Sequence, residues 1–472
     1  MTGRWLAACV AAFVGACPQS GHTQSTSSQS TPLERTSRIP DTSAAGIAET
    51  LGDTPTAPIS PWQPFAKDGV ALTLTYTGEA ATNVTGGLTR DAAYAGQVFA
   101  GVDADLDRIL GIPGATIHVA MTNRHGQSLS AIAIGNNTSV QEIFGTQNTH
   151  LALLTWQQKL FDGKFEFELG RSVSNVAFTT SPYYCAFQTN AVCGNPVFVY
   201  FAGNSSGFPA SRWAMHATVR FTPSVSFHAG AYEVNPDRGA RGDHGFDFGT
   251  ANATGVYVPF ELAYDSGAAG ARLPGHYQVG GWLDRSSYED PLRDDAGGIA
   301  VLTGATPARR FGRTGGYVRF DQALTRKASP TPRGLGIFGV AMANIDGRVP
   351  SDRFFELGLL QTGTFRGRDT DTIGFVVTDQ RLSELAIRRL AAARIAAGGD
   401  GDGIDRHQVM LELNYGLQLG RALRVLPNVQ YIVNPDQLSA PFQRKASGDA
   451  LVFGFRLSVD ALALHDIAKK GQ

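Results

Sequence analysis

Residues 69–77 have the sequence Gly-Val-Ala-Leu-Thr-Leu-Thr-Tyr-Thr, in which apolar and polar side chains alternate. One face of this segment carries Val70, Leu72, Leu74 and Tyr76, and the other face carries threonines. A period of two is typical of a β-strand with two different faces. Similar segments of about ten residues recur from Lys67 to the C-terminus. The sequence therefore predicts an all-β fold.

The composition indicates that one of these faces contacts lipid. Of 472 residues, 40 are Lys or Arg and 41 are Asp or Glu, so the formal charge is only −1. This balance disfavours a nucleic-acid binder. Charged residues make up 17% of the chain, below the roughly 25% of soluble domains, while apolar residues make up an ordinary 43%. Beyond the N-terminus there is no apolar run long enough for a membrane helix.

The connections between the alternating segments are of two kinds. Short turns occur at 111–114, 161–164, 222–224 and 419–421, and long connectors at 126–148, 176–210, 236–253, 286–311 and 381–405. Short turns at one end and long loops at the other are typical of outer-membrane barrels. The pattern predicts an antiparallel transmembrane β-barrel of about 16 strands, with an aqueous channel. The expected strands are 69–82, 93–109, 116–126, 149–161, 164–175, 210–222, 224–235, 254–265, 275–285, 312–326, 335–344, 353–365, 370–380, 406–418, 422–433 and 448–461.

The N-terminus has the pattern of a secretory signal peptide. Arg4 precedes an apolar run from Leu6 to Ala16, and small residues follow. We expect a signal peptide over 1–25, a Ser/Thr/Pro-rich linker with a short helix over 26–60, and the barrel over 61–472. A lipid on Cys17 is an alternative outcome of processing, because Val-Gly-Ala-Cys17 resembles a lipoprotein cleavage box.

Two cysteines remain in the exported part of the barrel, Cys185 and Cys193. In an oxidising compartment such a pair predicts a disulfide, and Tyr183 to Asn195 offers no His or carboxylate for a metal. The pair lies in a stretch from Ser172 to Ser211 that has no charged residue in forty positions. This stretch could fold into the pore, cap its mouth or remain a stapled surface loop.

Several stretches, spread in order over about 60–461, resemble the carbohydrate-selective outer-membrane porins of Gram-negative bacteria (OprB-type). They are Tyr76-Thr-Gly-Glu79, Asn83-Val-Thr-Gly-Gly87, Leu110-Gly-Ile-Pro-Gly-Ala-Thr116, Leu160-Phe-Asp-Gly-Lys164, Gly367-Arg-Asp-Thr-Asp-Thr-Ile-Gly374, Val409-Met-Leu-Glu-Leu-Asn-Tyr415 and Pro427-Asn-Val-Gln-Tyr-Ile-Val-Asn-Pro435.

The resemblance implies a sixteen-stranded barrel with a short N-terminal periplasmic segment. It also implies passive diffusion of glucose and other small sugars through a constricted channel into the periplasm. The chain departs from outer-membrane barrels at its C-terminus, where Leu462 to Gln472 follows a last strand that does not end the chain on an aromatic residue. This departure concerns recognition by the barrel-assembly machinery.

A selective sugar pore needs hydrogen-bond partners on its wall, and ionised groups make the stronger bonds. Trp282 shares the phase of Gln278 and Asp284, so it either offers a ring face to a sugar or lies in an interfacial girdle. Strand phase places in the lumen Glu79, Asp103, Asp105, His118, Arg124, Glu166, Glu168, Arg212, His216, Arg220, Glu261, Trp282, Arg319, Asp321, Glu412, Asn414, Asn428 and Gln430.

Three alternatives remain open: a general diffusion porin, a barrel enzyme acting on lipid or saccharide, and a soluble exported saccharide-binding β-protein. An enzyme would need a Ser or Asp beside a His, for which His118, His216 and His228 are the lumen-phase candidates. We expect neither a cofactor nor a metal. The expected partners are small sugars, outer-membrane lipid, the barrel-assembly machinery and, as an open possibility, further copies of the chain, but no nucleic acid.

Overall fold

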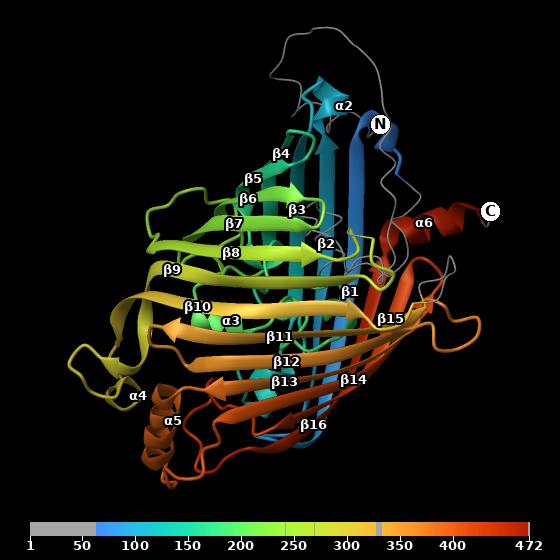
Figure 1. The fold of residues 1–472 in the computed structure, drawn as a ribbon. Helices are drawn as coiled ribbons and strands as arrows, with labels where there is room; N and C mark the ends of the chain where they lie inside the picture. Colours follow the sequence, from blue (N-terminus) through green and yellow to red (C-terminus); the bar gives the residue numbers. More distant parts are fainter. Residues whose placement is uncertain (1–62, 241, 269, 327–332, 471–472) are drawn as a thin grey trace, which may run out of the picture.

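A computed structural model describes residues 63–240, 242–268, 270–326 and 333–470. The predicted signal peptide, the possible lipid site at Cys17 and the predicted linker lie outside these residues. Sixteen antiparallel strands form a closed barrel, in which each strand pairs with its neighbours in sequence and β1 pairs with β16 (Figure 1). The predicted fold class and strand number are confirmed. No helix among the described residues is long and apolar enough to cross a membrane.

The strand bounds differ from the predicted ones mostly by a few residues. The strands are β1 Val70–Gly87, β2 Ala92–Asp105, β3 Ala115–Gly126, β4 Thr149–Leu160, β5 Phe165–Ser172, β6 Arg212–Thr222, β7 Val225–Val234, β8 Gly255–Asp265, β9 Gly275–Asp294, β10 Pro307–Ala323, β11 Gly334–Asp346, β12 Ser351–Thr362, β13 Thr372–Leu382, β14 His407–Leu419, β15 Leu423–Val433 and β16 Gly448–Asp460.

The predicted connector at 286–311 is the largest error in the strand bounds. β9 extends to Asp294 and β10 begins at Pro307. The two strands pair from Asp294 and Pro307 to Gly275 and Gln322, with two register shifts. The many polar and charged side chains of this stretch hid its alternation. β9 is therefore longer than the predicted 275–285, and β10 starts before the predicted 312.

Four short helices among the described residues lie at the two ends of the barrel: α2 Leu106–Leu110, α4 Ala300–Thr303, α5 Glu384–Ala396 and α6 Ala461–Lys470. A fifth, α3 Phe198–Ala202, lies inside the barrel against β10 and β12. In Figure 1, α2 and α6 lie at the end where β1 begins, and α4 and α5 lie at the other end. The long loops are therefore at the α4 and α5 end, which faces the exterior in outer-membrane barrels.

The wall has the two faces that the alternation predicts. Val279, Val318 and Leu413 point outward and are 62%, 54% and 54% exposed, as expected of side chains that contact lipid rather than protein. Their neighbours Gln278, Arg319 and Glu412 point inward and are buried.

The hydrophobic core lies inside the barrel. Residues of the β5–β6 loop (residues 173–211) pack against the inner wall, so Tyr183, Tyr184 and Phe187 surround the ring of Phe338. Phe338 in turn lies over Gly358, where a Cβ atom would be 2.1 Å from the ring. The absence of a side chain at Gly358 thus makes room for the aromatic cluster that holds the loop.

Two loops at the outer end are joined by a buried carboxylate. Asp436, in the β15–β16 loop (residues 434–447), accepts hydrogen bonds from the backbone N–H groups of Leu438, at 2.9 Å, and of Asn137, at 3.1 Å. Asn137 belongs to the β3–β4 loop (residues 127–148). Burial raises the pKa of Asp436 from its ordinary value of 3.8 to about 6.

This shift predicts a pH-dependent attachment of the β15–β16 loop. The docked loop binds the Asp436 proton more tightly than an undocked loop does, so docking weakens as pH rises from about 4 to about 6 and then levels off. Hydrogen exchange of residues 434–447, corrected for its intrinsic pH dependence, measures this change. Asp436→Asn should abolish it, while Asp400→Asn, at an exposed position, should retain it. An unchanged pH dependence in Asp436→Asn would contradict the assignment.

Candidate functional site

The uncharged β5–β6 loop folds into the barrel, which settles the direction that the sequence left open. It leaves β5 at Ser172 and returns at Arg212, yet its tip contacts β14, β15, β16 and β1, on another part of the wall. The structure joins Cys185 and Cys193 by a disulfide within this tip. The loop therefore crosses the lumen and narrows it.

Glu412 of β14 holds the tip of the loop. Its carboxylate accepts the backbone N–H groups of Gln188, at 3.0 and 3.1 Å, and of Thr189, at 2.8 Å. Asn414 of the same strand donates to the Ala186 carbonyl and to Glu412. A buried carboxylate that accepts several N–H groups is a strong, charge-assisted anchor.

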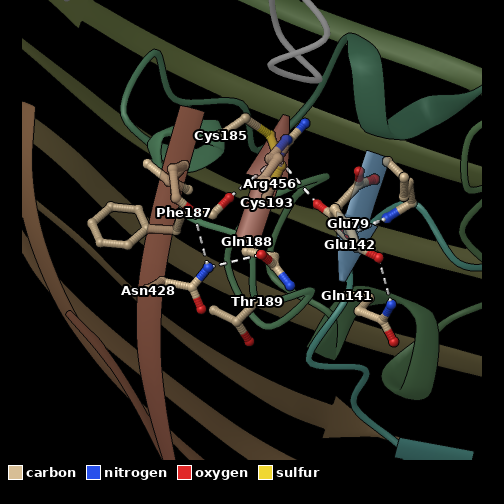
Figure 2. Close-up of polar contacts among 12 residues, drawn as sticks. Glu79, Gln141, Glu142, Cys185, Phe187, Gln188, Thr189, Cys193, Asn428 and Arg456 are labelled. Carbon is tan, nitrogen blue, oxygen red and sulfur yellow. Dashed lines mark hydrogen bonds and ion pairs between the residues drawn. A yellow bond between two sulfur atoms is a disulfide. The ribbon is translucent and has the colours of Figure 1, made fainter. Parts of the chain in front are cut away.

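Side chains of β15 and β16 complete the anchor (Figure 2). Asn428 donates to the Gln188 side chain at 2.7 Å. Arg456 donates to the Phe187 carbonyl at 3.3 Å and to the Cys193 sulfur at 3.4 Å, and it lies 3.5 Å from the Glu79 carboxylate of β1. The wall thus offers carboxylates to the N–H groups of the loop and a guanidinium to a carbonyl.

The β3–β4 loop lies beside this tip. Its Gln141 side chain donates to the Glu79 carbonyl at 2.9 Å, and Gln430 of β15 donates to the Val140 carbonyl at 3.0 Å. The two loops also bond to each other, because the Glu142 N–H donates to the Gln188 carbonyl at 3.1 Å. The β3–β4 loop therefore lies inside the barrel together with the β5–β6 loop.

A cation and an anion meet between these two loops. Arg124 of β3 donates to Gln97 at 2.5 Å, lies 3.8 Å from the Glu142 carboxylate and is stacked 5.4 Å over the Phe208 ring. Glu142 comes from the β3–β4 loop and Phe208 from the β5–β6 loop. The two opposite charges lie within the bore and add almost no net charge to it.

A second set of wall residues holds the root of the β5–β6 loop. Glu261 of β8 accepts from the Thr179 N–H at 2.6 Å and from the Tyr317 hydroxyl at 2.5 Å. Asp321 of β10 accepts from the Ser181 hydroxyl at 2.5 Å and pairs with Arg319. The loop is therefore anchored on two separate parts of the wall.

Trp282 matches neither of the two expectations for it. It points inward, but it is fully buried under α3, where its indole N–H donates to the Ala202 carbonyl at 3.3 Å. The Phe198 ring packs edge-on against it. Its phase was inferred correctly, but sequence could not indicate that a loop helix would cover the ring.

Asp105 also differs from its predicted role. It is the N-cap of α2, and its carboxylate accepts from the N–H groups of Asp107 and Arg108. Its side chain is 45% exposed at the end of the barrel. Asp105 is the last residue of β2, where the chain passes into α2, so its side chain caps the helix and does not line the bore.

The other predicted residues lie along the inward face of the strands. Asp103 pairs with His118 at 2.7 Å, and Glu166 pairs with Arg220 at 2.9 Å near the short turns. Glu168 is buried and Arg212 is partly buried, at a greater distance from those turns. These side chains are not brought into the loop anchors described above.

Two of the three candidate histidines of the enzyme alternative lie beside an Asp or Ser side chain. His118 pairs with Asp103, and His228 lies 3.0 Å from the Ser226 hydroxyl with the Thr218 hydroxyl on its other nitrogen. His216 packs edge-on against Phe178. Within the described residues, no group of three or more His, Cys, Asp or Glu side chains could hold a metal ion.

Three important residues were missed by the sequence reasoning. The alternation of Phe453, Phe455 and Leu457 on the lipid side would have placed Arg456 inside. The period of β2 would likewise have found Gln97. Glu142 lies in a loop without periodicity, so the sequence carried no signal for its direction.

Comparison with known proteins identifies the family. Residues 89–460 match the model described as carbohydrate-selective porin, OprB family. Porin B of Pseudomonas aeruginosa is 30% identical over 381 residues, covering 78% of this chain and 83% of the relative. The putative porin QuiX of Acinetobacter baylyi is 27% identical over 392 residues, covering 79% and 86% of the two chains.

A solved structure agrees with these relatives. The high-pH structure of Pseudomonas putida OprB has a TM-score of 0.75 and 29% sequence identity, covering 84% of this chain and 95% of that one. Together with the closed sixteen-stranded barrel, these matches give both the activity and its location. The chain belongs to the OprB family of carbohydrate-selective porins and is a sugar-selective channel of the bacterial outer membrane.

Proposed function

We propose that the β5–β6 and β3–β4 loops together form the sugar-selective constriction, and that glucose and other small sugars diffuse passively through it into the periplasm. The observation that carries this proposal is an uncharged loop held across the lumen by charged groups of the wall. A sugar is neutral and covered with hydroxyl groups. A loop rich in hydroxyls, amides and backbone groups offers such a solute hydrogen bonds in place of water.

The pairing of charges supports a neutral solute. Arg124 is beside Glu142, Arg456 beside Glu79, and Arg319 beside Asp321. An anion or phosphate channel would instead favour a ring of arginines and lysines. Paired charges polarise the hydrogen-bonding surface without attracting ions of one sign.

We assign two roles to the inward-facing residues. Six of them hydrogen-bond to groups of the loops and therefore position the loops: Glu79, Glu261, Asp321, Glu412, Asn414 and Gln430. Arg124 contacts both loops and is buried, so it joins the two loops to each other and to the wall. To the remaining inward-facing residues we assign contacts between the wall and a passing sugar: Asp103, His118, Glu168, Arg212 and Arg220.

Passive diffusion through this constriction needs no catalytic step. The apolar outer face suits outer-membrane lipid, and insertion is assigned to the barrel-assembly machinery. Because α6 follows β16, that machinery would have to recognise an internal strand rather than the end of the chain. Association of several copies is compatible with this arrangement.

Single-channel conductance tests the function directly. In a planar bilayer, glucose should reduce the conductance of the refolded protein saturably, because a bound sugar occupies the constriction. A disaccharide should block at a different concentration. Conductance that is indifferent to both sugars would indicate a general diffusion pore and would contradict the proposed selectivity.

Glu412→Ala should release the tip of the β5–β6 loop. It leaves the buried N–H groups of Gln188 and Thr189 without their acceptor, which costs about 1–3 kcal/mol for each unsatisfied group. We expect a higher single-channel conductance and weaker block by glucose. Glu384→Ala, at an exposed position of α5, is the matched control. Equal conductance in both variants would argue against anchoring by Glu412.

Replacing Cys185 and Cys193 together by alanine should loosen the tip without opening the barrel. The disulfide spans a sequence separation of 8, for which chain entropy predicts roughly 2–3 kcal/mol in favour of the ordered tip over a disordered tip. We expect unchanged thermal unfolding of the barrel but larger fluctuations of the open-channel current. A large drop in the unfolding temperature would instead assign the bond to barrel stability.

A further inference from the structure

The outer wall has a hollow that the sugar pathway does not use. It has a volume of about 480 Å³ and lies over β10 to β14. Ala341, Arg353 and Phe355 are exposed there, whereas their neighbours Met342 and Phe354 are 3% exposed and point inward. The alternation of the strands therefore places the opening of this hollow on the outside of the barrel, facing the membrane.

The strand register arranges its lining as one row. Gly316 is opposite Ala343, Ala343 is opposite Arg353, Arg353 is opposite Arg381, and Arg381 is opposite His407. The residues of this row on β10 and β11 are a glycine and an alanine. Those on β12, β13 and β14 are two arginines and a histidine. Arg381 and His407 lie at the strand ends next to the long loops, so the row is near the outer rim of the wall.

Two carboxylates, those of Asp352 and of Asp379, which also lines the hollow, meet the two arginines and the histidine of this row. Arg381 forms a two-pronged pair with Asp352, at 2.7 and 2.8 Å, and His407 lies 2.9 Å from the Asp379 carboxylate. Within the described parts of the chain, the guanidinium of Arg353 has no hydrogen bond or ion pair, although it is directly opposite Arg381. Like charges in directly opposed positions destabilise a sheet. An anion bound at this point would remove that cost.

We propose that this hollow binds a phosphorylated lipid of the outer leaflet, with a phosphate at Arg353 and an acyl chain along Gly316, Ala341 and Ala343. Two observations select this occupant. Phosphate suits a guanidinium fork, and the small side chains next to it leave an apolar channel that a free phosphate would not fill. The positions along the strands also fit, because Arg381 and His407 lie at strand ends beside the long loops, and Ala341 lies farther than Ala343 from the outer end of β11.

Native mass spectrometry of the full-length protein in detergent tests the proposal, with diphosphorylated lipid A and its dephosphorylated form as probes. We expect the diphosphorylated form to bind about tenfold more tightly, as one charge-assisted hydrogen-bonded contact would give. Arg353→Ala should remove this difference. Arg285→Ala, at another exposed arginine of the outer wall, should retain it.

A second pair of variants tests the apolar part. Ala341→Trp should fill the hollow and reduce binding of both lipids at least tenfold. Leu413→Trp, at another outward position of the wall away from the hollow, should not. Glucose-dependent conductance reports that each variant is folded. The proposal is overturned if Arg353→Ala keeps the preference, if Ala341→Trp binds normally, or if inorganic phosphate alone displaces the lipid. Lipid-free dimers that Ala341→Trp converts to monomers would identify a second copy of the chain as the occupant instead.

Discussion

Every backbone N–H and C=O group that crosses the membrane must find a partner within the protein, because hydrocarbon offers none. Pairing of β1 with β16 meets this requirement, since it leaves no free strand edge. Closure of the barrel also determines which environment each side chain meets. Each strand has one face toward lipid and one toward the lumen, so Val279 and Gln278, although adjacent in sequence, lie in opposite environments. The polar interior needed for a sugar channel follows from the same alternation.

A barrel of sixteen strands would have a wide bore, and the β5–β6 loop, with the β3–β4 loop beside it, narrows it. The β5–β6 loop is the one that crosses the lumen. Because that loop is uncharged, it can be buried without bringing unpaired charges into the interior. Its backbone groups still need partners, and Glu412 and Arg456 of the wall supply them. Glu412 and Arg456 of the lumen thus hydrogen-bond to the protein's own loop. They thereby set the shape of the constriction.

The architecture was predictable because the wall is periodic. Alternation identified sixteen strands and the inward direction of Glu412, Arg319 and Glu261, and connector lengths distinguished the two ends of the barrel. The prediction failed where the period ends or where polar residues mask it. Asp105 lies one residue before a helix and caps it, and β9 continues through a stretch that resembles a loop in composition.

The direction of a loop is a different kind of information, because it depends on contacts between residues far apart in sequence. Gln188 meets Asn428 across 240 positions, and neither residue shows this locally. The same limit explains Trp282, whose phase was right but whose ring is covered by α3. A lumen-facing position in a narrowed barrel can therefore hold a loop, contact a sugar or do both, and the two roles differ in their partners. Residues whose partners are loop backbone groups act on the shape of the constriction, and Arg124, which donates to the Phe208 carbonyl beside Glu142, is one of them.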